Sequence, residues 1–149
     1  MEAVVFIGIQ ATGKSAFYQR RFADTHIRLN LDMLKTRRRE QILLKACLEA
    51  RQPFVIDNTN ITREARARYI SQARAAGFGV VGYYFKSALQ SAIERNDQRS
   101  GKARIPVRGI VATHRKLELP SRDEGFDRLF YVEIGDDGAF VVKEWGDEV

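Results

Sequence analysis

The distribution of apolar residues predicts strands that alternate with helices along the whole chain. Continuous apolar runs, AVVFIGI (Ala3–Ile9) and VVGYYF, are typical of strands buried on both faces, as in a parallel sheet. Shorter runs in HIRLNLD, PFVID and RLFYVEI predict three more strands. GDDG followed by AFVVKEW predicts a hairpin turn into an antiparallel edge strand at the C-terminal end.

Helical spacing between these runs predicts the connecting helices. We expect helices from about Lys14 to Ala23, from about Met33 to Glu49 and from Arg108 to Leu117, with another in LQSAIERNDQ. A further helix begins near Thr62, a residue type favoured as an N-cap. On the Met33–Glu49 helix the apolar residues at helical spacing are Ile42, Leu43, Ala46, Cys47 and Ala50. The alternation predicts an α/β domain with a five-stranded, mainly parallel sheet flanked by helices on both faces.

Composition agrees with one folded domain spanning residues 1–149. The chain has 149 residues, of which 44% are hydrophobic and 30% charged. No apolar run approaches the roughly 18 residues that a membrane helix needs, and MEAVVFIGIQ lacks the basic start of a signal peptide. A single cysteine, Cys47, leaves no intramolecular disulfide. We therefore expect an intracellular protein, cytoplasmic or nuclear, without a membrane partner.

The segment GIQATGKS matches the phosphate-binding pattern G-x-x-x-x-G-K-S, directly after the first strand and at the start of a helix. Glycines let the backbone approach a phosphate, and amide N–H groups at the helix N-terminus then face it. Lys14 would reach the β- and γ-phosphates, and Ser15 would bind Mg²⁺. The segment predicts a P-loop NTPase fold that binds ATP and Mg²⁺. Its nucleotide-binding residues would be Gly8, Gln10, Ala11, Thr12, Gly13, Lys14, Ser15 and Ala16.

Polar residues follow the second and third strands, where an open α/β sheet places its site. Asp32 in NLD is a candidate general base for a hydroxyl acceptor, or alternatively the N-cap of the next helix. Asp57 in DNTN would hold Mg²⁺ through water, or alternatively orient the NTN turn. Thr59 and Asn60 of the same segment are candidates for acceptor binding.

Two basic segments lie near these strand ends. RSGKARIPVR predicts a mobile loop within a lid at about residues 95–108, where Arg95, Arg99, Lys102 and Arg104 would close over ATP. KTRRRE follows Asp32, and one or two of its cations, Arg38 among them, would follow acceptor phosphates while the rest are solvated. The net charge of +6 and a pI near 9.7 favour a polyanionic partner.

Several blocks together resemble the 5′-kinase domain of polynucleotide kinases. They are GIQATGKS, LNLDML, VIDNTN, ARYISQARAAG, ERNDQR, IPV and EGFDRLFYVEI, in the order and spacing of that family over roughly Ala3 to Ile134. The likeness is greatest to the kinase half of the eukaryotic enzyme that combines a 3′-phosphatase with a 5′-kinase, and the phage kinase shares the outline. The P-loop is common to many kinases, whereas IDNTN and ARYISQARAAG are more specific.

The resemblance implies roles for individual residues. Asp32 matches the family's general base, and Lys35 and Thr59 match residues that contact substrate phosphate in the phage enzyme. Arg95 and Arg99 match lid arginines that face the ATP phosphates, and with Lys14 and Asp32 they form the predicted catalytic set. Leu31 stands where the family has an arginine, so one cation beside the acceptor is absent.

Three functions are therefore open. The first is ATP-dependent phosphorylation of a 5′-hydroxyl end of DNA or RNA, with separate repair or ligation proteins as partners. The second is a P-loop kinase of a small alcohol such as a nucleoside, nucleotide or sugar, because fold does not determine the acceptor. The third is a non-catalytic nucleotide-binding module, against which the intact Lys14, Ser15 and Asp32 argue.

Overall fold

A single sheet organises the computed structural model, which describes residues 1–146. Its strands among these residues lie in the order β2-β3-β1-β4-β5-β6, and the β5–β6 pair is antiparallel while the other neighbours are parallel. The strands are β1 (Glu2–Ile7), β2 (Ile27–Leu29), β3 (Phe54–Ile56), β4 (Gly79–Phe85), β5 (Arg128–Ile134) and β6 (Phe140–Glu144). The predicted α/β class and the antiparallel C-terminal strand are confirmed. Residues 147–149 of the predicted domain lie outside the described part.

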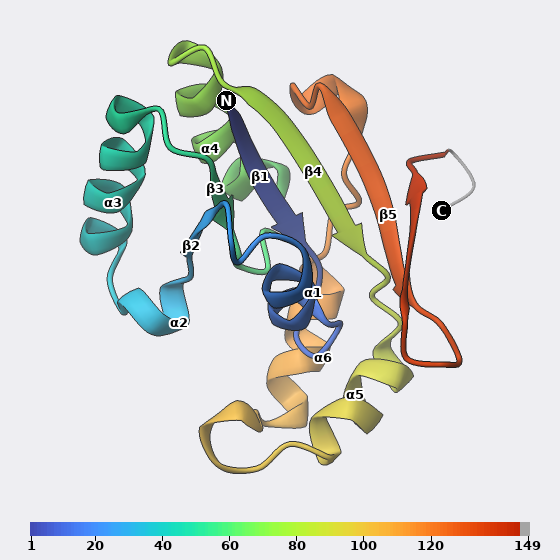
Figure 1. Cartoon of the computed structure of the whole chain (residues 1–149). Coiled ribbons are helices and arrows are strands. Elements are labelled where there is room, and N and C mark those ends of the chain that lie inside the picture. Colours follow the sequence, from blue (N-terminus) through green and yellow to red (C-terminus); the bar gives the residue numbers. More distant parts are fainter. Residues whose placement is uncertain (147–149) are drawn as a thin grey trace.

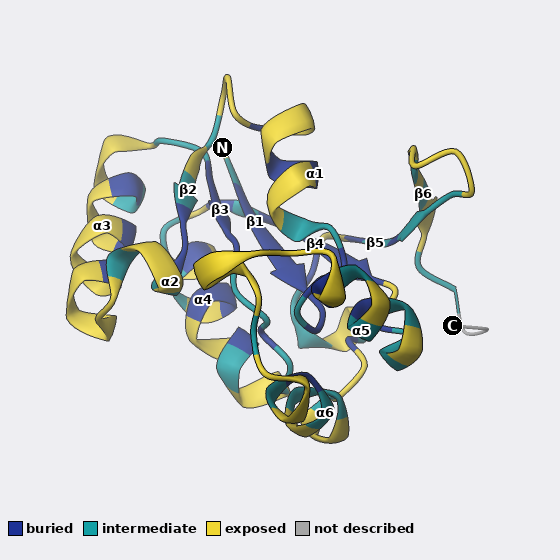
Figure 2. Ribbon diagram, turned by 90° about the horizontal axis from the view of Figure 1, so that it is seen from below, coloured by how far each residue is buried: buried dark blue, intermediate teal, exposed yellow. Residues whose placement is uncertain are grey.

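Helices cover both faces of the sheet. They are α1 (Lys14–Arg21), α2 (Leu31–Leu34), α3 (Arg37–Ala50), α4 (Arg63–Ala75), α5 (Leu89–Asp97) and α6 (Val107–Lys116), with 3₁₀ turns η1 (Gly101–Ala103) and η2 (Arg122–Glu124). Figure 2 shows α1 on one side of the buried strands and α4 and α6 on the other. Within the described residues no helix has the length and apolar character needed to cross a bilayer.

Alternation along β1 divides the core between the two faces. Val4 and Phe6 pack with Phe17 and Phe22 of the α1 region, in a cluster of aromatic rings 5.8–6.0 Å apart. The intervening Ala3, Val5 and Ile7 pack toward α3 and α4, together with Leu44, Cys47 and Tyr69. Because successive strand side chains point to opposite faces, one short strand anchors both helical layers.

The region between β2 and β3 differs from the prediction of one helix. It contains α2 and α3, separated at Lys35, whose φ of 74° is incompatible with a continuing helix. The Thr36 hydroxyl accepts a hydrogen bond from the Arg39 N–H (3.1 Å) and caps α3. Of the predicted apolar face, Cys47 is buried, whereas Ile42 and Leu43 are exposed. The other buried residues of α3 are Glu40 and Leu44.

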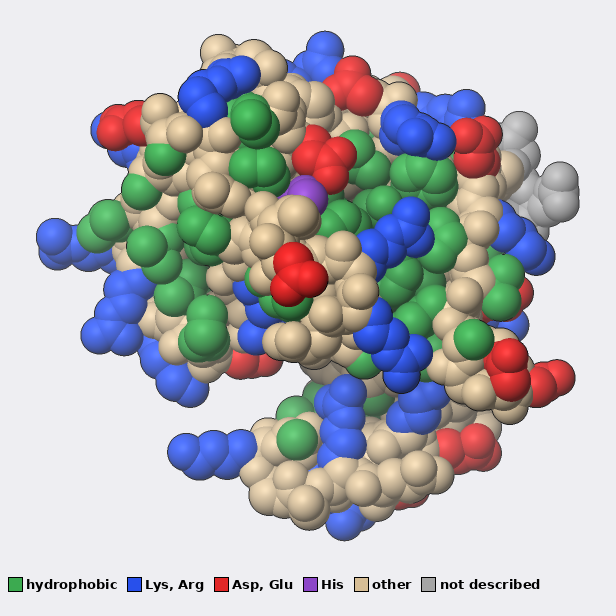
Figure 3. Space-filling view, in the orientation of Figure 1, with side chains coloured by type: hydrophobic (Ala, Val, Ile, Leu, Met, Phe, Trp, Pro, Cys, Tyr) green, Lys and Arg blue, Asp and Glu red, His purple; other side chains and the backbone are tan. Residues whose placement is uncertain are grey.

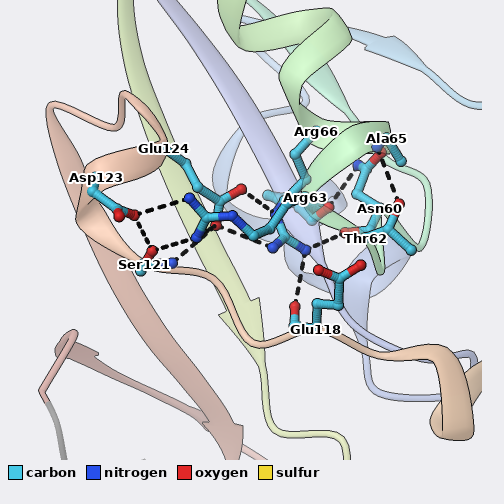
Figure 4. A network of polar contacts seen from close by, with 10 residues as sticks. Asn60, Thr62, Arg63, Ala65, Arg66, Glu118, Ser121, Asp123 and Glu124 are labelled. Carbon is cyan, nitrogen blue, oxygen red and sulfur yellow. Dashed lines mark hydrogen bonds and ion pairs between the residues drawn. The ribbon is translucent and has the colours of Figure 1, made fainter.

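The polar network of Figure 4 joins α4 to the segment after α6 through Arg66. The Arg66 side chain is fully buried although it is charged, and it pairs with both carboxylate oxygens of Glu124 at 2.7 and 3.0 Å. The same guanidinium donates to the carbonyl oxygens of Asn60 (2.9 Å) and Glu118 (3.0 Å). Arg66 lies at helical spacing from Tyr69, Ile70 and Ala73, so it is on the buried face of α4. Arg66 therefore fastens the segment after α6 to the turn after β3.

The predicted edge strand, β6, and Trp145 after it have a packing role. The Trp145 ring lies edge-on to the ring of Tyr84, with centroids 5.4 Å apart, and the Trp145 backbone N–H donates to the Leu129 carbonyl oxygen (2.9 Å). On the opposite side of β6, Phe140 packs against Phe17 of α1 at 5.1 Å. The C-terminal hairpin thus covers an edge of the sheet and supports the helix that follows the P-loop.

Candidate active site

The P-loop lies between β1 and α1, at the carboxyl end of the parallel strands (Figure 1). Gly13, the N-cap of α1, has a φ of 98°, and a Cβ there would lie 2.9 Å from the Phe140 ring. Both facts require glycine. The Gly8 N–H donates to the Thr59 carbonyl oxygen (2.9 Å), and the Ile9 N–H donates to Ser87 Oγ (3.1 Å). The loop is therefore held between the turns after β3 and β4.

Lys14 folds back into the loop. Its Nζ donates to the carbonyl oxygens of Gly8 (2.9 Å) and Ile9 (2.6 Å). Burial is the main reason that the pKa of Lys14 falls from 10.5 to about 8; the carboxylates of Asp57 and Asp32 act in the opposite direction, and Arg99 lowers it further. The Lys14 ammonium is thus held near the carboxylates of Asp32 and Asp57 and near the guanidinium of Arg99.

A cleft of about 440 Å³ brings the P-loop, two other strand ends and the lid together. Figure 3 shows a hollow between the body and the lower lobe, with Lys and Arg side chains on both sides. The residues that line the cleft are Gln10, Ala11, Thr12, Gly13, Lys14, Ser15, Ala16, Asn30, Leu31, Asp32, Asp57, Asn58, Thr59, Arg99 and Ile105. Most of the residues expected from the sequence therefore share one cavity.

Asp32 is an exposed residue on the wall of the cleft, in α2. The N-cap of this helix is Asn30, whose Oδ1 accepts from the Met33 N–H (3.0 Å), so the alternative interpretation of Asp32 as a cap was wrong. The Asn30 amide also donates to the Asp57 carbonyl oxygen (2.6 Å). Asn30 therefore orients α2, and the exposed Asp32 carboxylate has no capping role there.

Ser15 and Asp57, the predicted metal ligands, are in contact. Ser15 Oγ lies 3.3 Å from Asp57 Oδ2, to which it donates a hydrogen bond. Oxygen donors of this kind suit Mg²⁺, which binds a few protein oxygens together with water and nucleotide phosphates. The Asp57 carboxylate accepts from Ser15 and from Arg28 rather than from the NTN backbone. Within residues 1–146 no three His, Cys, Asp or Glu side chains cluster as a metal site.

The lid comprises the end of α5, η1 and the start of α6. Arg95 Nη1 donates to the Ala11 carbonyl oxygen (3.2 Å), which connects α5 to the P-loop. Arg99 lies beyond the end of α5, so it does not share a helix face with Arg95, and it lines the cleft. The Asn96 side chain exchanges two hydrogen bonds with the Ile105 backbone, at 2.7 and 3.0 Å, and closes the lid loop. Lys102 and Arg104 are exposed and do not line the cleft.

The residues predicted to bind the acceptor differ in their position relative to the cleft. Thr59 lines the cleft. Asn60 is buried outside it, and its amide donates to the Phe6 carbonyl oxygen (2.7 Å), so its side chain braces the turn against β1. Lys35 and Arg38 are exposed at the junction of α2 and α3, next to the cleft wall but not in its lining.

A buried network that sequence reasoning missed supports α2. Glu40 accepts from the Tyr69 hydroxyl (2.8 Å) and from the Asn58 amide (3.0 Å), and the Asn58 oxygen accepts the Leu31 N–H (2.9 Å). Burial, and then the Glu40 hydrogen bond and charge, raise the pKa of Tyr69 to about 12. The signal was the spacing of Glu40 four and seven residues before Leu44 and Cys47, which places a carboxylate on the core face.

Residues 4–120 match a family described as an AAA domain (AAA_33). The chain belongs to this family. The matched residues include the intact P-loop, with Lys14 and Ser15. The match ends before β5 and β6, so the C-terminal hairpin that packs on α1 lies outside it.

Over 135 residues the AAA_33 chain is 28% identical to the bifunctional polynucleotide phosphatase/kinase of Schizosaccharomyces pombe. The alignment covers 86% of this chain and 32% of that protein, so the chain spans about a third of its relative's length. Two solved structures share the fold, each with a TM-score of 0.64. A gluconokinase from Sinorhizobium meliloti 1021 is 20% identical (91% and 83% of the two chains covered), and Chaetomium thermophilum Kti12 in complex with ADP-AlF3 is 17% identical (91% and 90%).

Proposed function

We propose that the chain is a polynucleotide kinase that transfers the γ-phosphate of ATP to a 5′-hydroxyl end of DNA or RNA. The observation that carries the proposal is the position of Asp32, an exposed carboxylate in the same cleft as Lys14 and Arg99. A hydroxyl that enters between them meets a base on one side and the cations of the nucleotide site on the other. The identity with the S. pombe phosphatase/kinase over most of the chain supports a polynucleotide as the acceptor.

The residues divide the chemistry between them. Asp32 accepts the proton of the attacking hydroxyl, which makes the oxygen a better nucleophile as the bond to phosphorus forms. Lys14 leaves the carbonyl oxygens of Gly8 and Ile9 for the phosphates, and Arg99 approaches them from the lid. Mg²⁺, held by Ser15 and through water by Asp57, would withdraw charge from the phosphates when bound.

Positive charge beside the cleft favours a polyanionic acceptor. Lys35 and Arg38 are exposed where α2 meets α3, immediately after the wall that carries Leu31 and Asp32. A strand that placed its terminal hydroxyl at Asp32 would lead its next phosphates toward these cations. Leu31 is apolar and stands where the polynucleotide kinase family has an arginine, so this wall lacks one cation. The phosphate contacts would therefore depend on Lys35, Arg38 and Thr59. Separate repair or ligation proteins would then use the phosphorylated end.

The test compares acceptors under one set of conditions. The chain is supplied with labelled ATP and Mg²⁺, and with a 5′-hydroxyl oligonucleotide of DNA or RNA, a nucleoside 3′-monophosphate, a bare nucleoside or gluconate. We expect label on the 5′ end of the oligonucleotide, removable by a 5′-phosphatase. An oligonucleotide already carrying a 5′-phosphate is the matched control and should gain none. Transfer to a nucleoside or to gluconate with none to the oligonucleotide would reject the polynucleotide acceptor.

A further inference from the structure

We propose that Arg28 is an internal counter-ion that occupies the predicted metal ligands until nucleotide arrives, so that metal binds to this site only together with nucleotide. Arg28 is the middle residue of β2. Its Nε donates to Asp57 Oδ2 (2.8 Å) and its Nη2 donates to Ser15 Oγ (3.0 Å). One guanidinium therefore engages both side chains that we expect to serve Mg²⁺.

Burial makes this contact hard to replace. Asp57 is only 2% exposed, and a carboxylate so far from water needs a cation or several donors. Arg28 supplies the charge, and its planar fork reaches two acceptors at once. The Ser15 hydroxyl then accepts from Arg28 while it donates to Asp57, which completes a closed triangle of hydrogen bonds. In this arrangement the charge of Asp57 is balanced without a metal ion.

A divalent ion alone gains little from this site. To reach Ser15 Oγ it must displace the guanidinium or lie beside it, and like charges in a partly buried site repel strongly. The phosphates of a nucleotide change this balance, because they bring negative charge and further oxygen ligands. The Tyr18 ring, whose centroid lies 5.9 Å from Arg28 Cζ, would keep a cation–π contact with the guanidinium as it moves away from the metal ligands.

Linkage makes the effect reciprocal. If Arg28 weakens metal binding more in the nucleotide-free protein than in the nucleotide complex, then metal and nucleotide must each strengthen the binding of the other. Removing the guanidinium should raise metal affinity in the free protein and reduce this coupling. The inference rests on the proposed metal-assisted transfer but not on the acceptor, so failure of the acceptor assay would leave it untouched.

Mn²⁺ is the probe, because its free concentration is measured directly by electron paramagnetic resonance. It is titrated into the full chain without nucleotide and with saturating ADP, for wild type, Arg28→Gln and Arg74→Gln. Arg74 is the matched control, since it is a half-exposed arginine paired with Asp127 (3.6 Å) and is not among the residues that line the cleft. We expect Arg28→Gln to bind Mn²⁺ about tenfold more tightly than wild type without ADP, within the usual range of coupling between sites. The gain should be smaller with ADP.

Two results would overturn the proposal. One is equal nucleotide-free Mn²⁺ affinity for wild type and Arg28→Gln, and the other is an equal gain in Arg74→Gln, which would reflect net charge alone. If Arg28→Gln does not fold, the proposal is tested on the wild-type protein by its melting temperature. Mg²⁺ should leave the melting temperature of the free protein unchanged and should raise it in the presence of ADP. An equal rise with and without ADP would reject the counter-ion role.

Discussion

The ammonium of Lys14 donates to the carbonyl oxygen of Ile9 at 2.6 Å, inside the loop that is expected to receive phosphate. The loop thus uses its own backbone to hold the lysine before a nucleotide arrives. Burial lowers the pKa of this lysine to about 8, so the free protein loses the charge within an accessible pH range. Phosphates favour the charged form and would raise the pKa again.

Nucleotide binding should therefore take up a proton above pH 8. The free protein is increasingly neutral at Lys14 as the pH rises past 8, while the complex keeps the proton, so affinity falls with rising pH by up to about tenfold per unit. Calorimetry of ADP binding at pH 7 and pH 9, in buffers of different ionisation enthalpy, counts the protons. Lys14→Met should bind more weakly and show no uptake, and equal uptake in the variant would contradict the assignment.

Asp32→Asn should remove phosphoryl transfer but not nucleotide binding. The amide keeps the shape of the exposed side chain but cannot accept the proton of the hydroxyl, so we expect a loss of about 10²–10⁴ in kcat. Asp24→Asn, a charge change at another exposed aspartate, is the control and should remain active. Full activity of Asp32→Asn would show that another group is the base.

Lys35→Met should weaken binding of a 5′-hydroxyl oligonucleotide and make it less sensitive to salt. Each phosphate contact with a single strand contributes about 0.7 to the slope of log affinity against log salt, and the variant should lose one contact. KM for ATP should be unaffected. Lys45→Met removes an equal charge from the exposed face of α3 and serves as the control. An unchanged slope for Lys35→Met would exclude a phosphate contact.

Glu40→Gln should disturb the buried hydrogen-bond network that positions α2, the helix that carries Asp32. The carboxylate accepts from Tyr69 and Asn58, and a glutamine turns one acceptor into a donor that faces another donor. We expect a loss of about 1–3 kcal/mol in the free energy of unfolding, measured in urea. Because Asn58 holds the Leu31 N–H beside Asp32, kcat should fall while ADP affinity is retained. A stability loss with unchanged kcat would limit the network to folding.

Arg66→Ala should destabilise the fold strongly. It removes the closer of the two arginine partners of the buried Glu124 carboxylate, leaving Arg63 at 3.7 Å, and it removes donors from two carbonyl oxygens, which costs about 3–5 kcal/mol. Arg68→Ala, at an exposed position of the same helix, should stay within about 0.5 kcal/mol of wild type. Glu124→Ala should cost a similar amount, and the double variant should cost less than the sum. Simple additivity would show that the two side chains act independently.

The sequence predicted the elements whose signals are local. Buried strands and the P-loop between β1 and α1 follow from short-range pattern and from glycine at required positions. Thr62 was predicted as a cap and its hydroxyl accepts from the Ala65 N–H (3.1 Å). The break at Lys35 was missed because a four-residue helix carries no periodic signal. The inward face of α3 was predicted only at Cys47, because its core residue Glu40 is charged.

The sequence by itself determined the α/β class, the phosphate-binding loop and the polar residues at the strand ends, because each depends on residues close together along the chain. Only the tertiary structure decided how those residues combine. Asn60 and Arg66 became internal braces, since burial forces a polar side chain to find partners. Arg28 became the partner of Asp57 through parallel pairing of β2 and β3, a contact between residues 29 positions apart that no local pattern encodes.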